Sequence, residues 1–150
     1  MTSEFYDLLD SHLTRESDLA RAVVPMGMLL AWCVNMQLLN TQMLQAHERL
    51  ILRIRVEEAH GSELLVACGG DLRRDFFTRK GQQFLDSFYP RYLAVYADLF
   101  GDNFYATADT WATYRVVAKV LTAELMGPVP DHATGNRQNL LSKVVRLFRK

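Results

Sequence analysis

The residues best suited to metal binding or acid–base chemistry gather between His47 and His60, a stretch that also contains three glutamates. Histidine and carboxylate side chains are common metal ligands, but one ion needs them close together. The two histidines are thirteen positions apart, so on one helix they would lie about 20 Å from each other. The chain also lacks an HExxH motif. The sequence therefore predicts no metal site.

Serine, histidine and aspartate residues could together supply a nucleophile, its general base and the group that orients the base. The chain has no Gly-x-Ser-x-Gly turn to present such a serine. Its glycines also lack the spacing of a phosphate-binding loop. We therefore predict no catalytic residue, no small-molecule substrate and no cofactor. A small hydrolase whose site is assembled from distant residues is left open as a third alternative.

The stretch DNFYATADTW at 102–111 combines two aspartates, a tyrosine, two threonines and a tryptophan. Asp109 precedes a long apolar stripe, where a carboxylate can accept hydrogen bonds from the free N–H groups of a helix start, so it is predicted to be an N-cap. Trp111 is predicted to lie in the core. Asp102 and Asn103 follow a glycine and are predicted to form a turn that ends the preceding helix.

The composition is that of one globular domain. Of 150 residues, 49% are apolar and 23% are charged, close to the average of soluble domains. Seventeen basic side chains balance seventeen acidic ones, so the overall charge does not favour nucleic acid as a partner. The longest apolar run, residues 22–34, is too short to span a bilayer, and no signal peptide precedes it. With only two cysteines, Cys33 and Cys68, we expect a cytoplasmic protein without a disulfide scaffold.

Apolar residues recur at three- and four-residue steps, which predicts an all-α orthogonal bundle of about six or seven helices. The predicted helices cover residues 3–13, 17–39, 41–60, 62–68, 78–100, 110–126 and 137–150. Their predicted N-caps include Ser3, Ser17, Thr41, Thr78 and Asp109. Pro25 should break the second helix near Val24, and Pro90 should bend the helix that follows Thr78 into two. Arg53 and Glu57 are one helical turn apart and should form an ion pair. No sheet is predicted.

The charge is unevenly distributed along the chain. Residues 1–75 carry 11 acidic and 7 basic side chains, whereas residues 76–150 carry 6 acidic and 10 basic ones. The final residues, 136–150, contain five bases and no acid. We divide the chain into a helical domain at 1–126, a Pro/Gly-containing connector at 127–136 and a basic C-terminal helix at 137–150, packed on the same domain.

Three short sequence motifs of aromatic and small residues follow one another along the chain. The first comprises Gly27, Leu30, Ala31 and Trp32; the second Thr78, Gly81, Phe84, Tyr89, Tyr92, Leu93 and Tyr96; the third Tyr105, Asp109, Thr110, Trp111 and Tyr114. In this order they resemble a family of small all-helical bacterial proteins of unknown function, often encoded beside secreted polymorphic toxins. That family usually has a histidine two residues before the glycine of the first motif, where this chain has Pro25.

The resemblance implies an immunity protein, a cytoplasmic domain that binds one cognate toxin, covers its active site and performs no chemistry of its own. Toxins that act on nucleotides or nucleic acids often carry basic clefts, which acidic side chains could fill. The partner-binding residues predicted on this basis are Glu57, Glu58, Glu63, Asp71 and Asp75, with Asp102, Asn103 and Tyr105 as the exposed part of the 102–111 loop. For each acidic residue, a solvated helix face is the alternative.

A second function remains open at this stage. A regulatory adaptor or nucleic-acid accessory protein could use the basic C-terminal helix to contact phosphates, which would make its affinity depend on salt. The residues that would make these contacts are Arg137, Lys143, Arg146, Arg149 and Lys150.

Overall fold

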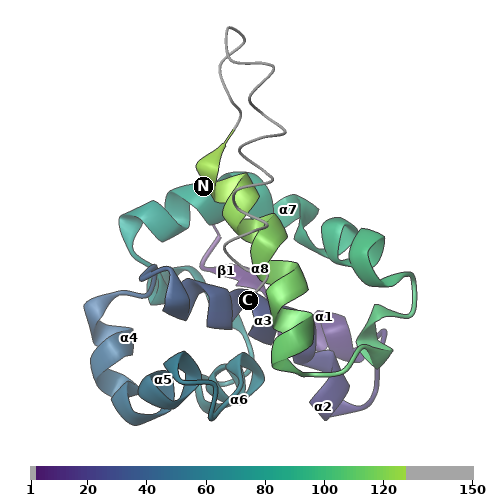
Figure 1. Ribbon diagram of the computed structural model, residues 1–150, viewed down its shortest axis with the longest axis horizontal. Helices are drawn as coiled ribbons and strands as arrows, with labels where there is room; N and C mark the ends of the chain where they lie inside the picture. The colour runs from purple at the N-terminus through teal and green to yellow at the C-terminus, as the bar shows by residue number, and fades with distance from the viewer. Residues whose placement is uncertain (1–2, 128–150) are drawn as a thin grey trace, which may run out of the picture.

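The computed structural model describes residues 3–127, which fold into helices around one central helix (Figure 1). The helices are α1 (Leu9–Leu13), α2 (Leu19–Ala22), α3 (Val24–Asn35), α4 (Thr41–Ala46), α5 (Glu48–Arg55), α6 (Gly61–Ala67), α7 (Arg79–Phe100) and α8 (Trp111–Met126). Two short strands, β1 (Phe5–Asp7) and β2 (Leu72–Arg73), and two 3-10 turns, η1 (Arg74–Phe76) and η2 (Phe104–Ala106), complete the described part. The all-α class is confirmed. Within 3–127 no helix combines the length and the apolar character that crossing a membrane would require.

The predicted basic helix at 137–150 lies outside the described residues, as does the predicted connector from residue 128 onward. The five basic residues Arg137, Lys143, Arg146, Arg149 and Lys150 belong to that part of the chain. A function that depends on them therefore stays a prediction.

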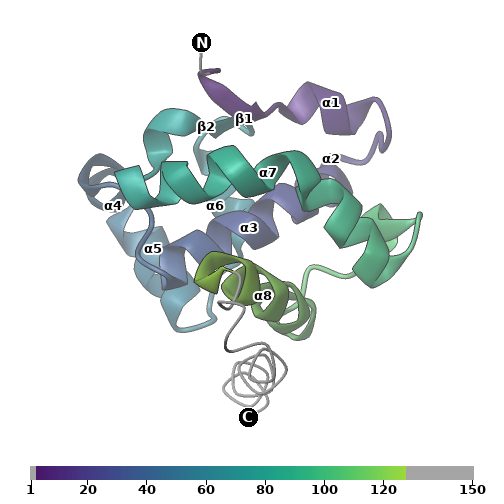
Figure 2. The same cartoon turned by 90° about the horizontal axis from the view of Figure 1, so that it is seen from above.

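α3 is the centre of the fold. Every residue from Val24 to Val34 is buried, and the helix packs most extensively against α6 and then against α8. In Figure 2, α7 and α8 flank α3. Pro25 lies in the first turn of α3, where its missing N–H removes no helical hydrogen bond. Because α2 ends at Ala22 and α3 begins at Val24, the predicted break near Val24 is confirmed.

The backbones of α3 and α6 touch at two glycines. A Cβ atom built on Gly61 would lie 1.9 Å from the carbonyl oxygen of Gly27, and one built on Gly27 would lie 2.5 Å from the backbone nitrogen of Ser62. No side chain fits at such distances, so both positions require glycine. This close approach places the first turn of α6, including Ser62, directly over the central helix.

α7 is one continuous helix of 22 residues. The predicted cap is confirmed, because the Thr78 hydroxyl accepts a hydrogen bond from the backbone N–H of Gly81 at 3.1 Å. The predicted division into two helices at Pro90 is wrong, although the ribbon curves along its length (Figure 2). Pro90 is exposed and cannot donate to the carbonyl of Asp86, which is the only helical hydrogen bond it removes.

The buried face of α7 carries a ladder of aromatic rings that fills the core. Phe84 and Phe88 stack with centroids 5.2 Å apart, and Tyr92 contacts Tyr96 edge-on at 5.8 Å. The hydroxyl of Tyr92 donates to the carbonyl of Pro25. The aromatic residues of the second motif therefore hold α7 against the start of α3.

The first segment of the chain is a strand where a helix was expected. β1 pairs antiparallel with β2, so that Phe5 lies opposite Arg73. The hydroxyl of Ser3 accepts from the backbone N–H of Phe5 at 3.1 Å and does not cap a helix. Local spacing suggested an apolar helical stripe, but pairing with a strand almost seventy positions away decided the conformation.

The predicted helix at 41–60 is also divided. The chain breaks at His47 (φ −127°, ψ 32°) between α4 and α5, and α5 already ends at Arg55. Asn40 replaces Thr41 as the cap, and Asp18 replaces Ser17 in α2. Gly61, expected to end this helix, begins α6.

Candidate functional site

Asp109 connects the start of α8 to the start of α6. Its carboxylate accepts a hydrogen bond from the hydroxyl of Ser62, in the first turn of α6. The N-cap of α8 is Thr110, whose hydroxyl accepts from the backbone N–H of Thr113 at 3.1 Å. The prediction that Asp109 would be the cap was wrong, because a side chain from another helix binds this carboxylate.

His60 lies on the exposed side of the same carboxylate. Its ring Nδ1 is 3.9 Å from the second carboxylate oxygen of Asp109. The ring is stacked on the indole of Trp111, with centroids 5.9 Å apart and planes inclined by 26°. Its backbone N–H donates to the carboxylate of Glu63 at 2.6 Å, which holds the loop before α6 in place. Trp111 packs against the core from its edge, so its predicted core position is only partly correct.

An ion pair closes the other side of this region. Arg115 on α8 donates to the carboxylate of Glu57 at 2.6 Å, and both side chains are close to half exposed. Glu57 adopts a positive φ of 61°, which costs a non-glycine residue about 1 kcal/mol. The residues next to this pair in the chain leave two apolar side chains at the surface: Val56, which precedes Glu57, is 63% exposed, and Val116, which follows Arg115, is 40% exposed.

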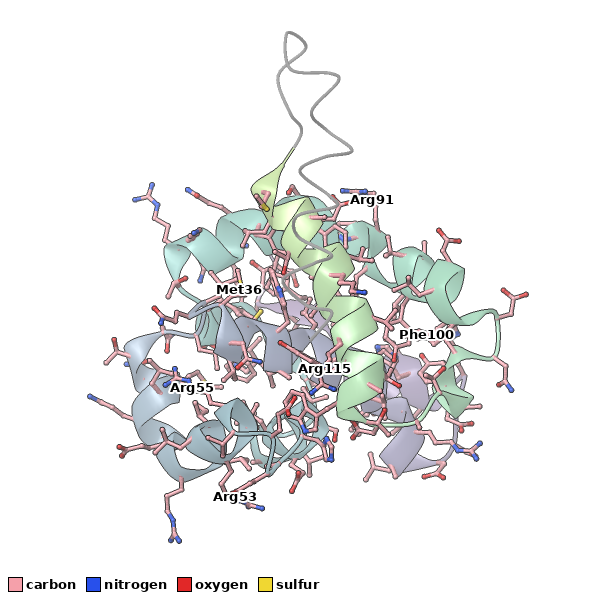
Figure 3. The ribbon with its side chains drawn as sticks, viewed as in Figure 1. Met36, Arg53, Arg55, Arg91, Phe100 and Arg115 are labelled. Carbon is pink, nitrogen blue, oxygen red and sulfur yellow. The ribbon has the colours of Figure 1, made fainter. Side chains whose placement is uncertain are left out.

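We call this region the α6–α8 corner. It consists of Val56, Glu57, His60, Ser62, Asp109, Trp111, Arg115 and Val116. In Figure 3, Arg115 lies on the side of α8 that faces α6. The corner combines a stacked aromatic pair, an arginine, two carboxylates and exposed valines, and the centres of protein–protein interfaces are enriched in such aromatic and arginine side chains.

Serine, histidine and aspartate meet in the corner, but not in a catalytic order. In a nucleophilic triad the histidine lies between the serine and the carboxylate. Here the carboxylate of Asp109 lies between the other two, because Ser62 bonds to it directly and His60 approaches its other oxygen. The serine hydroxyl therefore donates to a carboxylate and not to a general base. No group of three or more His, Cys, Asp or Glu residues within 3–127 could hold a metal ion.

The predicted partner-binding residues do not converge on one site. Glu57 belongs to the corner and Glu63 supports it through His60, while Glu58 follows Glu57 and is exposed. Asp71 accepts from the backbone N–H of Leu9 at 2.7 Å, and Asp75 pairs with Arg73 at 3.2 Å, so these two acids serve the region around β2. Asp102 and Asn103 are exposed between α7 and η2.

Tyr105 was expected to be exposed, and that expectation was wrong. It is 6% exposed, and its hydroxyl is 2.6 Å from Nδ1 of the buried His12. The other ring nitrogen of His12 is 2.6 Å from the carboxylate of Asp7, and the hydroxyl of Tyr89 also donates to that carboxylate. We call these four residues the Asp7–His12 cluster. It ties the segment before α1 to both α7 and η2.

Burial and charge keep the phenols of this cluster neutral. Burial raises the pKa of Tyr89 well above its usual value, and the negative charge of Asp7 raises it further. Burial also raises the pKa of Tyr105, although the nearby guanidinium of Arg15 acts in the opposite direction. Neutral tyrosines can donate hydrogen bonds to Asp7 and His12.

Sequence reasoning missed the corner because its residues come from two stretches, 56–62 and 109–116, that are far apart in the sequence. His60 and Ser62 flank a glycine whose close packing on α3 was not visible in the sequence, and Arg115 was one of two bases on its helix. The one local signal was the spacing of Trp111 and Arg115, which places both on one face of α8.

Comparison with known proteins gives a family. The sequence profile of a family described as a domain of unknown function, DUF7832, matches residues 5–109. No curated protein and no solved structure matches the chain. The matched region runs from β1 to Asp109 and so contains the whole Asp7–His12 cluster and part of the corner. Membership of a family of unknown function is confirmed, whereas the link to toxins stays a prediction. The chain belongs to the DUF7832 family.

Proposed function

We propose that this protein is an immunity-type binding protein, which neutralises a cognate toxin by covering its active site with the α6–α8 corner. The observation that carries the proposal is the stacked pair of His60 and Trp111 at the surface, held between two helix starts. Large aromatic side chains and arginines contribute most of the binding energy in many protein interfaces. The corner presents Arg115 on the same helix face as Trp111.

The corner is held in place before any partner arrives. Ser62 and Asp109 join the two helix starts, and the backbone contact between Gly27 and Gly61 fixes α6 on the central helix. A surface that is already ordered loses little conformational entropy on binding, so more of the contact energy appears as affinity.

The charges beside the corner favour a basic partner. Glu57, Glu58 and Glu63 lie within seven residues of one another in the chain, and Asp109 adds a fourth carboxylate. Arg115 neutralises one of them, which leaves a net negative surface. Such a surface accelerates association with a positively charged cleft. This is the chemistry of toxins that bind nucleotides or nucleic acids, and it needs no reaction by the immunity protein itself.

Co-expression tests the proposal. The protein would be produced in bacterial cells together with the toxin domain encoded in the neighbouring reading frame, and growth and co-purification would be measured. We expect protection by the unaltered chain and its loss in a Trp111→Ala/Arg115→Ala variant. Lys80→Glu, an exposed change at the start of α7, is the control and should protect fully. Full protection by the double variant would contradict the assignment of the corner, and no protection by the unaltered chain would contradict the function.

A further inference from the structure

α5 carries three arginines that have no carboxylate partner among residues 3–127. The sequence predicted that Arg53 would pair with Glu57, but α5 ends at Arg55 and Glu57 pairs with Arg115 on α8. Arg53 donates instead to the backbone carbonyl of Glu58 at 3.0 Å. None of the ion pairs formed within residues 3–127 includes Arg49, Arg53 or Arg55.

Two apolar side chains are exposed beside these arginines. Leu52 on α5 is 52% exposed, and Val56, which directly follows the helix, is 63% exposed. Beside Leu52, a groove of about 280 Å³ runs between α4 and α5. Its lining residues are Leu44, Gln45, Glu48, Ile51, Leu52 and Arg55. In Figure 3, Arg53 lies at the lower edge of the molecule, whereas Arg55 lies closer to α4.

We infer that this surface, which we call the α5 arginine face (Arg49, Leu52, Arg53, Arg55 and the groove), docks an acidic segment of a protein partner. An aliphatic or aromatic side chain of the segment would enter the groove, and its carboxylates would pair with the arginines. The arginine guanidinium binds a carboxylate through two parallel hydrogen bonds. Three arginines against one glutamate give α5 a net charge of +2, which complements an acidic segment.

The apolar content distinguishes a protein segment from other polyanions. Phosphate contacts need only the arginines and would leave Leu52 in water. A membrane surface would need a broad apolar face, whereas only Leu52 and Val56 are exposed here, beside a groove with a polar rim. A protein segment uses both the charge and the groove.

The inference does not rest on the proposed function. The α5 arginine face uses residues from α4 and α5, whereas the corner uses His60, Asp109 and α8. Val56 belongs to the corner and directly follows α5, so it is left unchanged in the test.

The test uses the full chain and three fluorescein-labelled synthetic peptides of twelve residues. The first alternates glutamates with leucine and phenylalanine, the second contains the same glutamates with serine at the apolar positions, and the third replaces the glutamates of the first by lysine. Fluorescence anisotropy would measure each Kd at low and at physiological salt. We expect saturable binding of the first peptide, weaker binding of the second, and none of the third.

Two variants assign the binding to this surface. Arg49→Glu/Arg53→Glu should weaken binding of the first peptide by about tenfold or more, because reversed charges repel its carboxylates. Arg79→Glu/Lys80→Glu at the start of α7 makes the same change in net charge elsewhere and should bind normally. Leu52→Ser should reduce the preference for the first peptide over the second.

Three results would overturn the inference. They are equal binding by both double variants, no difference between the first and second peptides, and arginine-dependent binding only of an oligothymidine strand or of phosphatidylserine vesicles. Circular dichroism of each variant would show that the helices remain folded, so that a loss of binding can be assigned to the surface.

Discussion

The two clusters that contain a histidine and an aspartate differ mainly in burial. In the Asp7–His12 cluster the imidazole is 1% exposed and its nitrogen is 2.6 Å from the carboxylate. In the α6–α8 corner the His60 side chain is 38% exposed and the corresponding distance is 3.9 Å. The same residue types therefore have different uses. The buried cluster satisfies its own polar groups and holds three segments together, whereas the corner keeps part of its polar and aromatic surface available for contact.

The largest expected effect is the loss of the buried imidazole. His12→Ala removes the group between Asp7 and Tyr105, so the Tyr105 hydroxyl loses this partner and the Asp7 carboxylate keeps only its bonds from Tyr89 and the Leu8 N–H. Leaving such groups unpaired should lower the free energy of unfolding by about 3 kcal/mol. Urea denaturation followed by circular dichroism measures it. His60→Ala is the matched control, and the comparison fails if both substitutions cost the same.

Tyr89→Phe should have the next largest effect on stability. It removes one hydroxyl that donates to the Asp7 carboxylate and keeps the aromatic ring in the core. A hydrogen bond to a charged group contributes about 2 kcal/mol, so the urea midpoint should fall clearly. An unchanged midpoint would show that this hydroxyl does not stabilise the cluster. Tyr6→Phe removes a hydroxyl from the exposed side of the same region and serves as the comparison.

Alkaline pH should weaken the buried cluster before the corner. The pKa of Tyr89 is raised in the folded protein, mainly by burial, so the unfolded chain loses this proton first. A tyrosine with a raised folded-state pKa stabilises the protein fully below pH of about 10 and progressively less above it. The stability measured by urea denaturation should therefore fall from pH 9 to pH 11. Tyr89→Phe should show a shallower fall, and an equal slope would contradict this assignment.

Ser62→Ala should lower the stability moderately. It tests whether Ser62 matters for placing Asp109 as well as for the free energy of unfolding. It removes the donor to Asp109, a carboxylate that is 29% exposed. Because water can replace part of this bond, we expect a loss of about 1 kcal/mol in the free energy of unfolding. Ser62→Thr keeps a hydroxyl and should retain more of the stability. If the toxin proposal is correct, protection should fall more for Ser62→Ala than for an equally destabilised variant of the other cluster.

The smallest effect on stability is expected at His60. Its side chain is partly exposed and lies beyond hydrogen-bond distance of Asp109, so His60→Ala should cost less than about 1 kcal/mol. Its effect on toxin binding should be larger, because the imidazole covers one face of the Trp111 indole. If His60→Ala lowered the stability but left toxin binding unchanged, the corner would serve to stabilise the fold and not to contact a partner.

The outcome at α3 and α7 shows what could be predicted from the chain alone. The break near Val24 and the cap at Thr78 depend on proline and on a hydroxyl within three residues of its target. Both are local effects. The division of α7 at Pro90 failed because the remaining helical hydrogen bonds and the buried aromatic face outweigh one missing donor.

Three of the errors share a physical cause. Ser62 and Asp109 are 47 positions apart, and β1 becomes a strand only because β2 pairs with it. Glu57 was expected to pair with Arg53 but pairs with Arg115, 58 positions away. In each case a partner from a distant segment competes successfully with the nearest local one, which reasoning from neighbouring residues cannot anticipate.

The sequence by itself determined the helical class, the central apolar helix with its break near Val24, and the cap of α7, because these depend on periodic burial and on groups within one turn of each other. Only the tertiary structure decided which histidine is buried, which carboxylates are occupied and which arginines lack a partner. Those properties depend on the contact of α3 with α6 and on the placement of α8 beside them. Packing between distant segments therefore decides which polar and charged side chains are free at the surface. The helices that present these side chains are decided by interactions between residues close together in the sequence.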